Sequence, residues 1–81
     1  MALTRENILG YLEQKQGVDV SQVESDDTPL FSAGLLDSFS MVDLILFLET
    51  EGGFKMQATD VNLDNLDTIG RMLAYAKSQT T

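Results

Sequence analysis

The sequence contains neither cysteine nor histidine. Disulfide bonds, thiol nucleophiles, zinc sites built from cysteine and histidine, and Ser/His triads are therefore excluded for this chain on its own. We identify no catalytic residue and no metal ligand in the sequence. Any chemistry must use carboxylates, hydroxyls or a group that is added to the chain, and we do not expect the chain itself to be an enzyme.

Basic residues are scarce, with 5 Lys and Arg against 13 Asp and Glu and a formal net charge of −8. Binding to nucleic acid or to an anionic membrane surface draws on clustered basic side chains, so neither is expected as a partner. A protein with a basic surface fits better, because an acidic surface attracts and orients a positive one.

Long apolar runs are also missing. The longest one, Met41 to Leu48, is interrupted by Asp43, whereas a membrane span needs about 20 apolar residues. The first residues, Met1 to Arg5, lack the basic-then-apolar pattern of a signal peptide. We therefore expect a cytoplasmic protein without membrane insertion.

What is present indicates a folded domain. Hydrophobic residues make up 43% and charged residues 22% of the chain, which is too apolar a balance for a disordered segment. With 81 residues there is room for one domain only. We expect a single, monomeric domain over residues 1–81, ordered from about 4 to 77, with a tail at 78–81.

The first helix is predicted by its ends. Thr4 is a good N-cap, Leu3 and Ile8 are spaced for a hydrophobic staple, and Gly17 offers a stop. Its apolar stripe consists of Ile8, Leu9, Tyr11 and Leu12.

A long loop is expected next, because turn formers dominate residues 18–36. Four apolar side chains would hold this loop on the core: Val20, Val23, Leu30 and Phe31. Val18 and Val20 alternate with Asp19, but one short run without a second strand cannot make a stable sheet.

The second helix should begin at Asp37 or Ser38, both good caps, and end at Gly52 and Gly53. It is apolar on two sides at helical spacing. One face carries Met41, Leu44, Ile45 and Leu48, and the opposite face carries Phe39, Asp43, Leu46 and Thr50.

The remaining chain predicts a short helical turn around Thr59 to Asp64 and a last helix from about Asp67. The buried positions of that last helix would be Ile69, Met72, Leu73 and Ala76. Gly70 inside it costs about 1 kcal/mol relative to Ala and would permit a close contact with another helix. The fold class is all-α: a small bundle of three main helices plus one short helix, with a long loop between the first and second helices.

One calcium-like pattern is rejected. Asp60, Asn62 and Asp64 have the first three spacings of an EF-hand loop, but its sixth position is Asn65 and its twelfth is Arg71. Glycine and a bidentate glutamate are required there. We interpret these residues as caps and turns around the short helix.

The segment around Ser38 reads Gly34, Leu35, Leu36, Asp37, Ser38, Phe39 and continues into the amphipathic second helix through Leu48 and Glu49. This pattern resembles the acyl and peptidyl carrier protein family. The resemblance extends over nearly the whole chain, including Phe54 and Met56 in the apolar turn that follows. The residues from Gly34 to Phe39 look most like D-alanyl carriers and other stand-alone carriers of specialised pathways.

The resemblance implies that Ser38 carries a covalent 4′-phosphopantetheine arm derived from coenzyme A. An exposed hydroxyl at a helix N-terminus also suits such a group on physical grounds, because the helix dipole favours the phosphodiester anion. Without the surrounding pattern, Ser38 would be interpreted as an ordinary N-cap.

The resemblance further implies a function and partners. The arm would hold an acyl or aminoacyl group as a thioester. A phosphopantetheinyl transferase would attach the arm, an adenylating ligase or acyltransferase would load it, and a downstream synthase or transferase would unload it. Partner enzymes would dock on Asp37, Phe39, Asp43 and Leu46, rimmed also by Glu49.

Two alternatives stay open at this point. Phe39 and Leu46 would instead cover the loop or complete the core if the second helix had only a structural role. The chain could also be a small acidic interaction module that binds a partner through the same helix without a prosthetic group. An acidic metal-binding or regulatory domain is a weaker third reading, given the failed calcium pattern.

Overall fold

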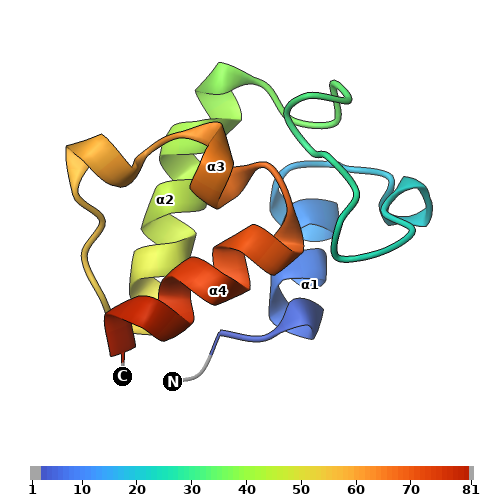
Figure 1. The fold of residues 1–81 in the computed structure, drawn as a ribbon. Helices are drawn as coiled ribbons and strands as arrows, with labels where there is room; N and C mark the ends of the chain where they lie inside the picture. Colours follow the sequence, from blue (N-terminus) through green and yellow to red (C-terminus); the bar gives the residue numbers. More distant parts are fainter. Residues whose placement is uncertain (1–2, 81) are drawn as a thin grey trace.

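All regular structure in residues 3–80, the part of the chain that this computed structural model describes, is helical (Figure 1). The elements in order are α1 (Arg5–Lys15), the 3₁₀ turn η1 (Val20–Gln22), α2 (Ser38–Gly52), the 3₁₀ turn η2 (Ala58–Asp60), α3 (Leu63–Leu66) and α4 (Ile69–Thr80). The expected all-α bundle of three main helices and one short helix is confirmed.

Helix α1 has the ends that the sequence predicts. The hydroxyl oxygen of Thr4 accepts from the Asn7 N–H at 3.2 Å, and the Asn7 side chain accepts from the Thr4 N–H at 2.8 Å. This reciprocal pair satisfies two N–H groups that would otherwise lack partners. Beyond the helix, Gly17 has a φ of 67°, which allows the chain to reverse.

Helix α2 also begins and ends where expected, with Asp37 as its N-cap and Gly53 as its C-cap. Gly53 has a φ of 72°, and its N–H donates to the Glu49 carbonyl at 2.9 Å. Glycine adopts this left-handed backbone conformation more readily than any other residue.

The C-terminal part is divided differently from the prediction. The single turn expected from Thr59 to Asp64 is two pieces, η2 and α3, and the last helix begins at Ile69 instead of Asp67. It begins later because the Thr68 hydroxyl caps it, accepting from the Arg71 N–H at 3.0 Å. Residues 78–80, where a tail was expected, continue α4, and Thr81 lies outside the described residues.

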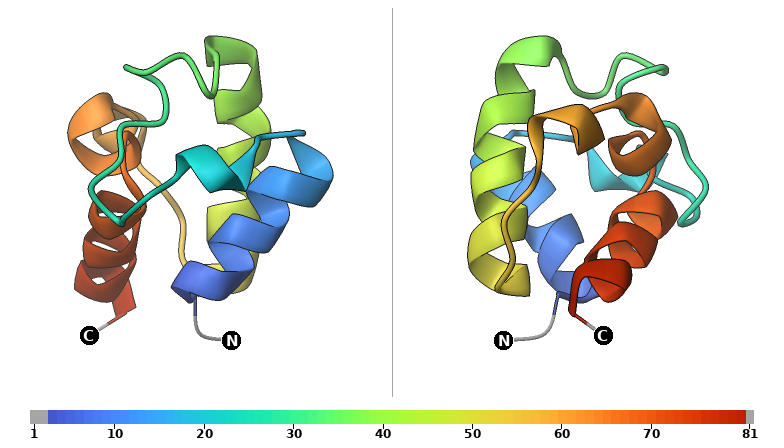
Figure 2. Two further views of the ribbon diagram at one scale, coloured as in Figure 1. Left: turned by 90° about the vertical axis from the view of Figure 1, so that its right-hand side faces the viewer. Right: turned by 60° about the vertical axis from the view of Figure 1, so that its left-hand side comes forward.

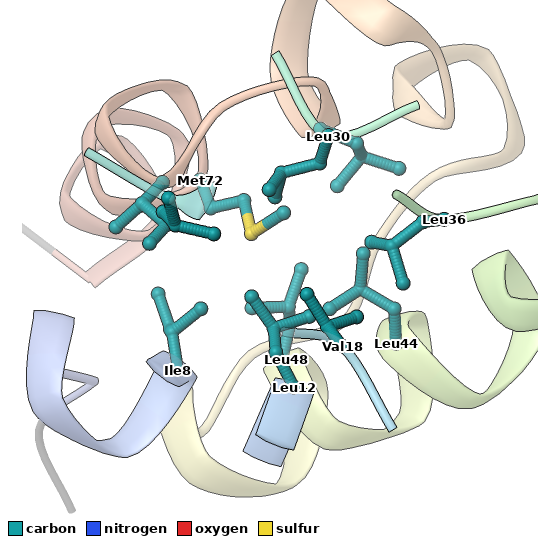
Figure 3. Packing of buried hydrophobic residues seen from close by; sticks show 11 residues of the cluster. Ile8, Leu12, Val18, Leu30, Leu36, Leu44, Leu48 and Met72 are labelled. Atoms are coloured by element: carbon teal, nitrogen blue, oxygen red, sulfur yellow. The ribbon is translucent and has the colours of Figure 1, made fainter. Parts of the chain in front are cut away.

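The core lies where α1, α2 and α4 face one another (Figure 3). Its fully buried side chains are Ile8, Leu12, Leu30, Leu44, Leu48, Leu66, Ile69 and Met72. Each large apolar side chain of this kind contributes about 1.5–3 kcal/mol by leaving water. The predicted inner face of α2 is thereby confirmed at Leu44 and Leu48, and Met41 and Ile45 are half-buried beside them.

The loop between α1 and α2 contributes to the core and is joined to α1 by an ion pair and to α4 by a hydrogen bond. Val23 and Leu30 are buried as predicted, whereas Val20 and Phe31 are half-buried. Asp26 accepts from the Arg5 guanidinium at 2.5 Å through its carboxylate and from the Gly70 N–H at 2.9 Å through its carbonyl. The close contact that Gly70 permits is therefore with this loop and not with a helix.

The start of α2 lies at the end of the molecule opposite both ends of the described chain (Figures 1 and 2). The loop that precedes it passes near α3 before it enters the helix (Figure 2). No helix within residues 3–80 is long and apolar enough to cross a membrane.

Candidate functional site at the start of helix α2

Asp37, rather than Ser38, is the N-cap of α2. Its carboxylate accepts from the Ser40 N–H at 2.9 Å and from the Ser40 hydroxyl at 3.1 Å. These hydrogen bonds from the Ser40 backbone and side chain hold the pKa of Asp37 below its usual value. Asp37 is therefore ionised at neutral pH.

Because Asp37 caps the helix, the hydroxyl of Ser38 is not needed as a cap. It is exposed, and its hydroxyl makes no hydrogen bond with any residue between 3 and 80. Ser40, by contrast, is half-buried, and its hydroxyl donates to Asp37. Of the two serines in the first turn, only Ser38 presents an accessible, unengaged hydroxyl.

The position of Ser38 suits an anionic substituent. As the first residue of a helix of 15 residues, it lies at the positive end of the helix dipole. The first N–H groups of a helix have no partner within it and favour a phosphate oxygen nearby. A phosphodiester on the Ser38 oxygen would thus be stabilised without disturbing the core.

The chain that leads into Ser38 is held by a tight turn. The Leu30 carbonyl accepts from the N–H groups of Leu35 and Leu36 at 2.9 and 3.0 Å. Gly34 allows this turn with a φ of 80°. Leu36, two residues before Ser38, is buried and packs in the core (Figure 3).

Asp67, between α3 and α4, holds the other side of this turn, a role that no pattern in the sequence predicts. Only 6% of its surface is exposed. Its carboxylate accepts from the Ser32 hydroxyl at 2.6 Å and from the N–H groups of Phe31 and Ser32 at 2.8 and 3.0 Å. Burial by itself would raise the pKa of Asp67, but these hydrogen bonds outweigh it and lower the pKa.

The outer face of α2 is apolar and uncovered. Phe39 is 88% exposed and Leu46 is 56% exposed, so the interpretation that they cover the loop or complete the core is wrong for the free chain. Val42, which the sequence analysis did not single out, is 63% exposed and lies between them. Its spacing of three and four residues from the other two would have identified it on a helical wheel.

The acidic residues of α2 divide into two groups. Asp37 and Asp43 are exposed beside this apolar stripe, as expected. Glu49 is half-buried, and its carboxylate accepts from the Met56 N–H at 2.8 Å. It stabilises the turn after α2, and its place in the rim stays a prediction.

A hollow of about 430 Å³ lies between α1 and α2, next to the apolar stripe. Asp43, Leu46 and Phe47 line it from α2, and Tyr11 and Lys15 line it from α1. The rings of Tyr11 and Phe47 are stacked with their centroids 4.2 Å apart, which fixes the spacing of the two helices there.

The residues of the calcium-like pattern act as caps and turns, as the sequence analysis interpreted them. The Asn62 side chain caps α3 by accepting from the Asn65 N–H at 3.2 Å. Asp60 accepts from the Tyr75 hydroxyl at 2.7 Å, and the Asn65 side chain donates to the Asp60 carbonyl at 2.9 Å.

Comparison with known proteins relates the whole domain to one family. Residues 6–76 match the family described as phosphopantetheine attachment site. The chain is 32% identical over 74 residues to the D-alanyl carrier protein of Leuconostoc citreum and 34% identical over 74 residues to that of Abiotrophia defectiva. Both alignments cover 91% of this chain and 92% of the relative. The acyl carrier protein of Thermotoga maritima is 32% identical over 68 residues, which is 84% of this chain and 80% of that protein.

Proposed function

The chain belongs to the phosphopantetheine-binding carrier protein family, and from that premise we propose that Ser38 is the residue to which the 4′-phosphopantetheine arm is attached. The chain is a carrier protein that holds an acyl or aminoacyl group on this arm. The thiol at the end of the arm supplies the thioester chemistry that the cysteine-free chain lacks.

The observation that most supports Ser38 as the attachment site is that its neighbours, and not Ser38 itself, make the hydrogen bonds that cap α2. Asp37 caps the helix and engages Ser40, and the Ser38 hydroxyl stays exposed without a partner within residues 3–80. A hydroxyl committed to capping would have to break a hydrogen bond before it could react.

The attachment step is a transfer at phosphorus. The Ser38 oxygen forms a bond to the pantetheine-bearing phosphorus of coenzyme A, and the bond from that phosphorus to adenosine 3′,5′-bisphosphate breaks. The hydroxyl proton leaves to a base of the transferase. The role of this chain is to present Ser38 at a helix N-terminus that accommodates the resulting anion.

The test is the intact mass after incubation with coenzyme A, Mg²⁺ and a broad-specificity phosphopantetheinyl transferase. We expect one phosphopantetheinyl addition to the wild type, none to Ser38→Ala and one to Ser40→Ala, the matched control from the same helical turn. Addition to Ser38→Ala would place the site wrongly. A wild type that gains no mass would favour an interaction module without a prosthetic group.

We propose that the chain is a delivery module and not an enzyme. Carrier proteins are generally non-catalytic. The exposed groups around Ser38 are a carboxylate that serves as a cap and apolar side chains, which offer no general base aimed at the serine.

Carrier proteins interact with a phosphopantetheinyl transferase and with further partner enzymes. We propose that these enzymes dock on the outer face of α2 through Asp37, Phe39, Asp43 and Leu46. Val42, which lies between Phe39 and Leu46 on this face, would also contact them. The apolar side chains would be buried in the complex, and the two carboxylates would meet basic groups of the partner. Because Leu46 lies eight residues after Ser38, the surface extends about 12 Å along the helix from the attachment point.

For the cargo, we propose an aminoacyl group that an adenylating ligase loads and a downstream transferase removes. This rests on the names of the relatives, several of which are D-alanyl carrier proteins, and on the residues from Gly34 to Phe39. We further propose that residues 1–81 act as one monomeric domain in the cytoplasm, where coenzyme A is available to the transferase.

A further inference from the structure

We propose that Asp67 is a positioning residue for Ser38: it fixes the turn from Leu30 to Leu36 and thereby the place of the serine that a transferase must reach. The proposal rests on the assignment of Ser38 as the attachment site. Asp67 is 35 residues away in the sequence from Ser32, whose side chain and backbone it binds.

The contact is concentrated on one short segment. Three donors from Phe31 and Ser32 converge on the Asp67 carboxylate at 2.6 to 3.0 Å, and the Leu30 N–H donates to the Asp67 carbonyl at 2.7 Å. Hydrogen bonds to an ionised acceptor are about twice as strong as neutral ones. Asp67 therefore holds three consecutive residues of the loop at fixed positions.

The constraint continues from this segment to the serine. Leu30 donates to Asp67 and, through its carbonyl, accepts from Leu35 and Leu36, so it joins both sides of the turn. Leu36 is buried, and Asp37 is fixed as the cap of α2. The three residues before Ser38, namely Leu35, Leu36 and Asp37, are thus each buried or hydrogen-bonded. Asp67 holds the beginning of the same turn.

A buried carboxylate is costly unless its partners satisfy it. Asp67 makes no salt bridge with any residue in the described range 3–80, and its side-chain partners all belong to Phe31 and Ser32 in the loop before α2. A role limited to starting the last helix does not need such an arrangement, because Thr68 caps α4.

The expected kinetic signature follows from the population of the competent loop. If the turn is released, only a fraction of the molecules presents Ser38 correctly, and the apparent affinity for the transferase falls by that fraction. The Michaelis constant for this chain in the transferase reaction should rise, whereas kcat should stay close to the wild-type value, because Ser38 itself is unchanged.

The experiment compares Asp67→Ala, Asp67→Asn and Ser32→Ala with the wild type. Asparagine can still accept from the two N–H groups and can donate to the Ser32 oxygen. We expect the Michaelis constant of Asp67→Ala to rise about tenfold, that of Ser32→Ala to rise less, and that of Asp67→Asn to stay near the wild-type value. The control is Ile8→Val, a core variant from α1 that should lower the melting temperature but leaves the hydrogen bonds of Asp67 in place.

Wild-type kinetics in Asp67→Ala would overturn the proposal. An increase in the Michaelis constant that follows the loss of melting temperature equally in Ile8→Val and Asp67→Ala would also overturn it, because the role would then be structural only. Amide hydrogen exchange provides a readout that needs no transferase. Exchange at Phe31, Ser32, Leu35 and Leu36 should accelerate in Asp67→Ala but not in Ile8→Val, and unchanged exchange would contradict the proposal even if Ser38 proved not to be the attachment site.

Discussion

Adjacent residues at the start of α2 have separate roles because of their side-chain chemistry. A carboxylate one residue before the helix accepts from the N–H of the third residue after it, and Asp37 does so with Ser40. The same geometry places the next side chain, Ser38, outside the cap. Both residues are good caps by type, so the sequence left two possible start points for the helix. The hydrogen bonds of Asp37 decide between them.

Two glycines test how local contacts modify intrinsic helix propensity. Gly10 in α1 has open space where a Cβ would stand, whereas a Cβ on Gly70 would lie 3.2 Å from the Asp26 carbonyl oxygen. We expect Gly10→Ala to raise the free energy of unfolding by about 0.5–1 kcal/mol. Gly70→Ala should gain none of this, because Asp26 is also held by Arg5 and cannot easily move away. Denaturant unfolding of both variants measures the difference, and equal gains would show that the loop gives way at Asp26.

The role of Asp67 could not have been predicted from the sequence. An aspartate just before a helical pattern is typical of an N-cap, and the sequence analysis used it to mark the start of the last helix. Its partners at Phe31 and Ser32 become neighbours only after the chain folds. Periodicity and capping rules describe local contacts and contain no information on such a pairing.

At the scale of elements, α2 was the most predictable. Its limits follow from Asp37 and Gly53, and its two apolar faces follow from the 3.6-residue period. The segment after Gly53 was less predictable because η2 and α3 are only three and four residues long. Such short turns carry almost no periodic signal, and their limits depend on which side chain captures which N–H group.

Leu44 and Leu46 on α2 test whether the two apolar faces have different functions. Leu44 is fully buried, so Leu44→Ala should destabilise the chain by about 2–5 kcal/mol. Leu46→Ala should leave the melting temperature nearly unchanged but weaken binding to a partner enzyme by about 1–2 kcal/mol.

Asp43→Lys should slow loading or modification at low salt, and the loss of rate should shrink as salt rises. The reason is that exposed charges act mainly on the rate of encounter and are screened by salt.

Glu13→Lys, which changes an exposed acidic residue of α1 by the same charge, is the control for Asp43→Lys. The binding constants and the loading rates are measured at several salt concentrations, and circular dichroism checks the fold of each variant. If Leu46→Ala melted the domain, the outer face of α2 would belong to the core. Equal losses in Glu13→Lys and Asp43→Lys would indicate a general effect of net charge and not a docking surface.

In the molecule as a whole, the buried core that stabilises the fold is separate from the exposed residues that we propose for cargo attachment and docking. The core draws on α1, α2, α4 and the loop between α1 and α2. The start of α2 lies opposite both ends of the described chain (Figure 2). Ser38, the exposed first residue of α2, is therefore accessible to a partner without interference from either end. The chain carries a net charge of −8, and Asp37 and Asp43 are exposed near this end, which favours approach by a basic partner.

The chain isolated from its native cell provides the most direct test of the central claim that a thioester-bound group is carried on Ser38. Its intact mass should exceed that of the polypeptide by one phosphopantetheinyl group plus a cargo, and the mass of the cargo would identify it. Hydroxylamine should remove the cargo and leave the arm, and fragmentation should locate the arm on Ser38. A chain that carries no arm, or an arm on any other residue, would contradict the account.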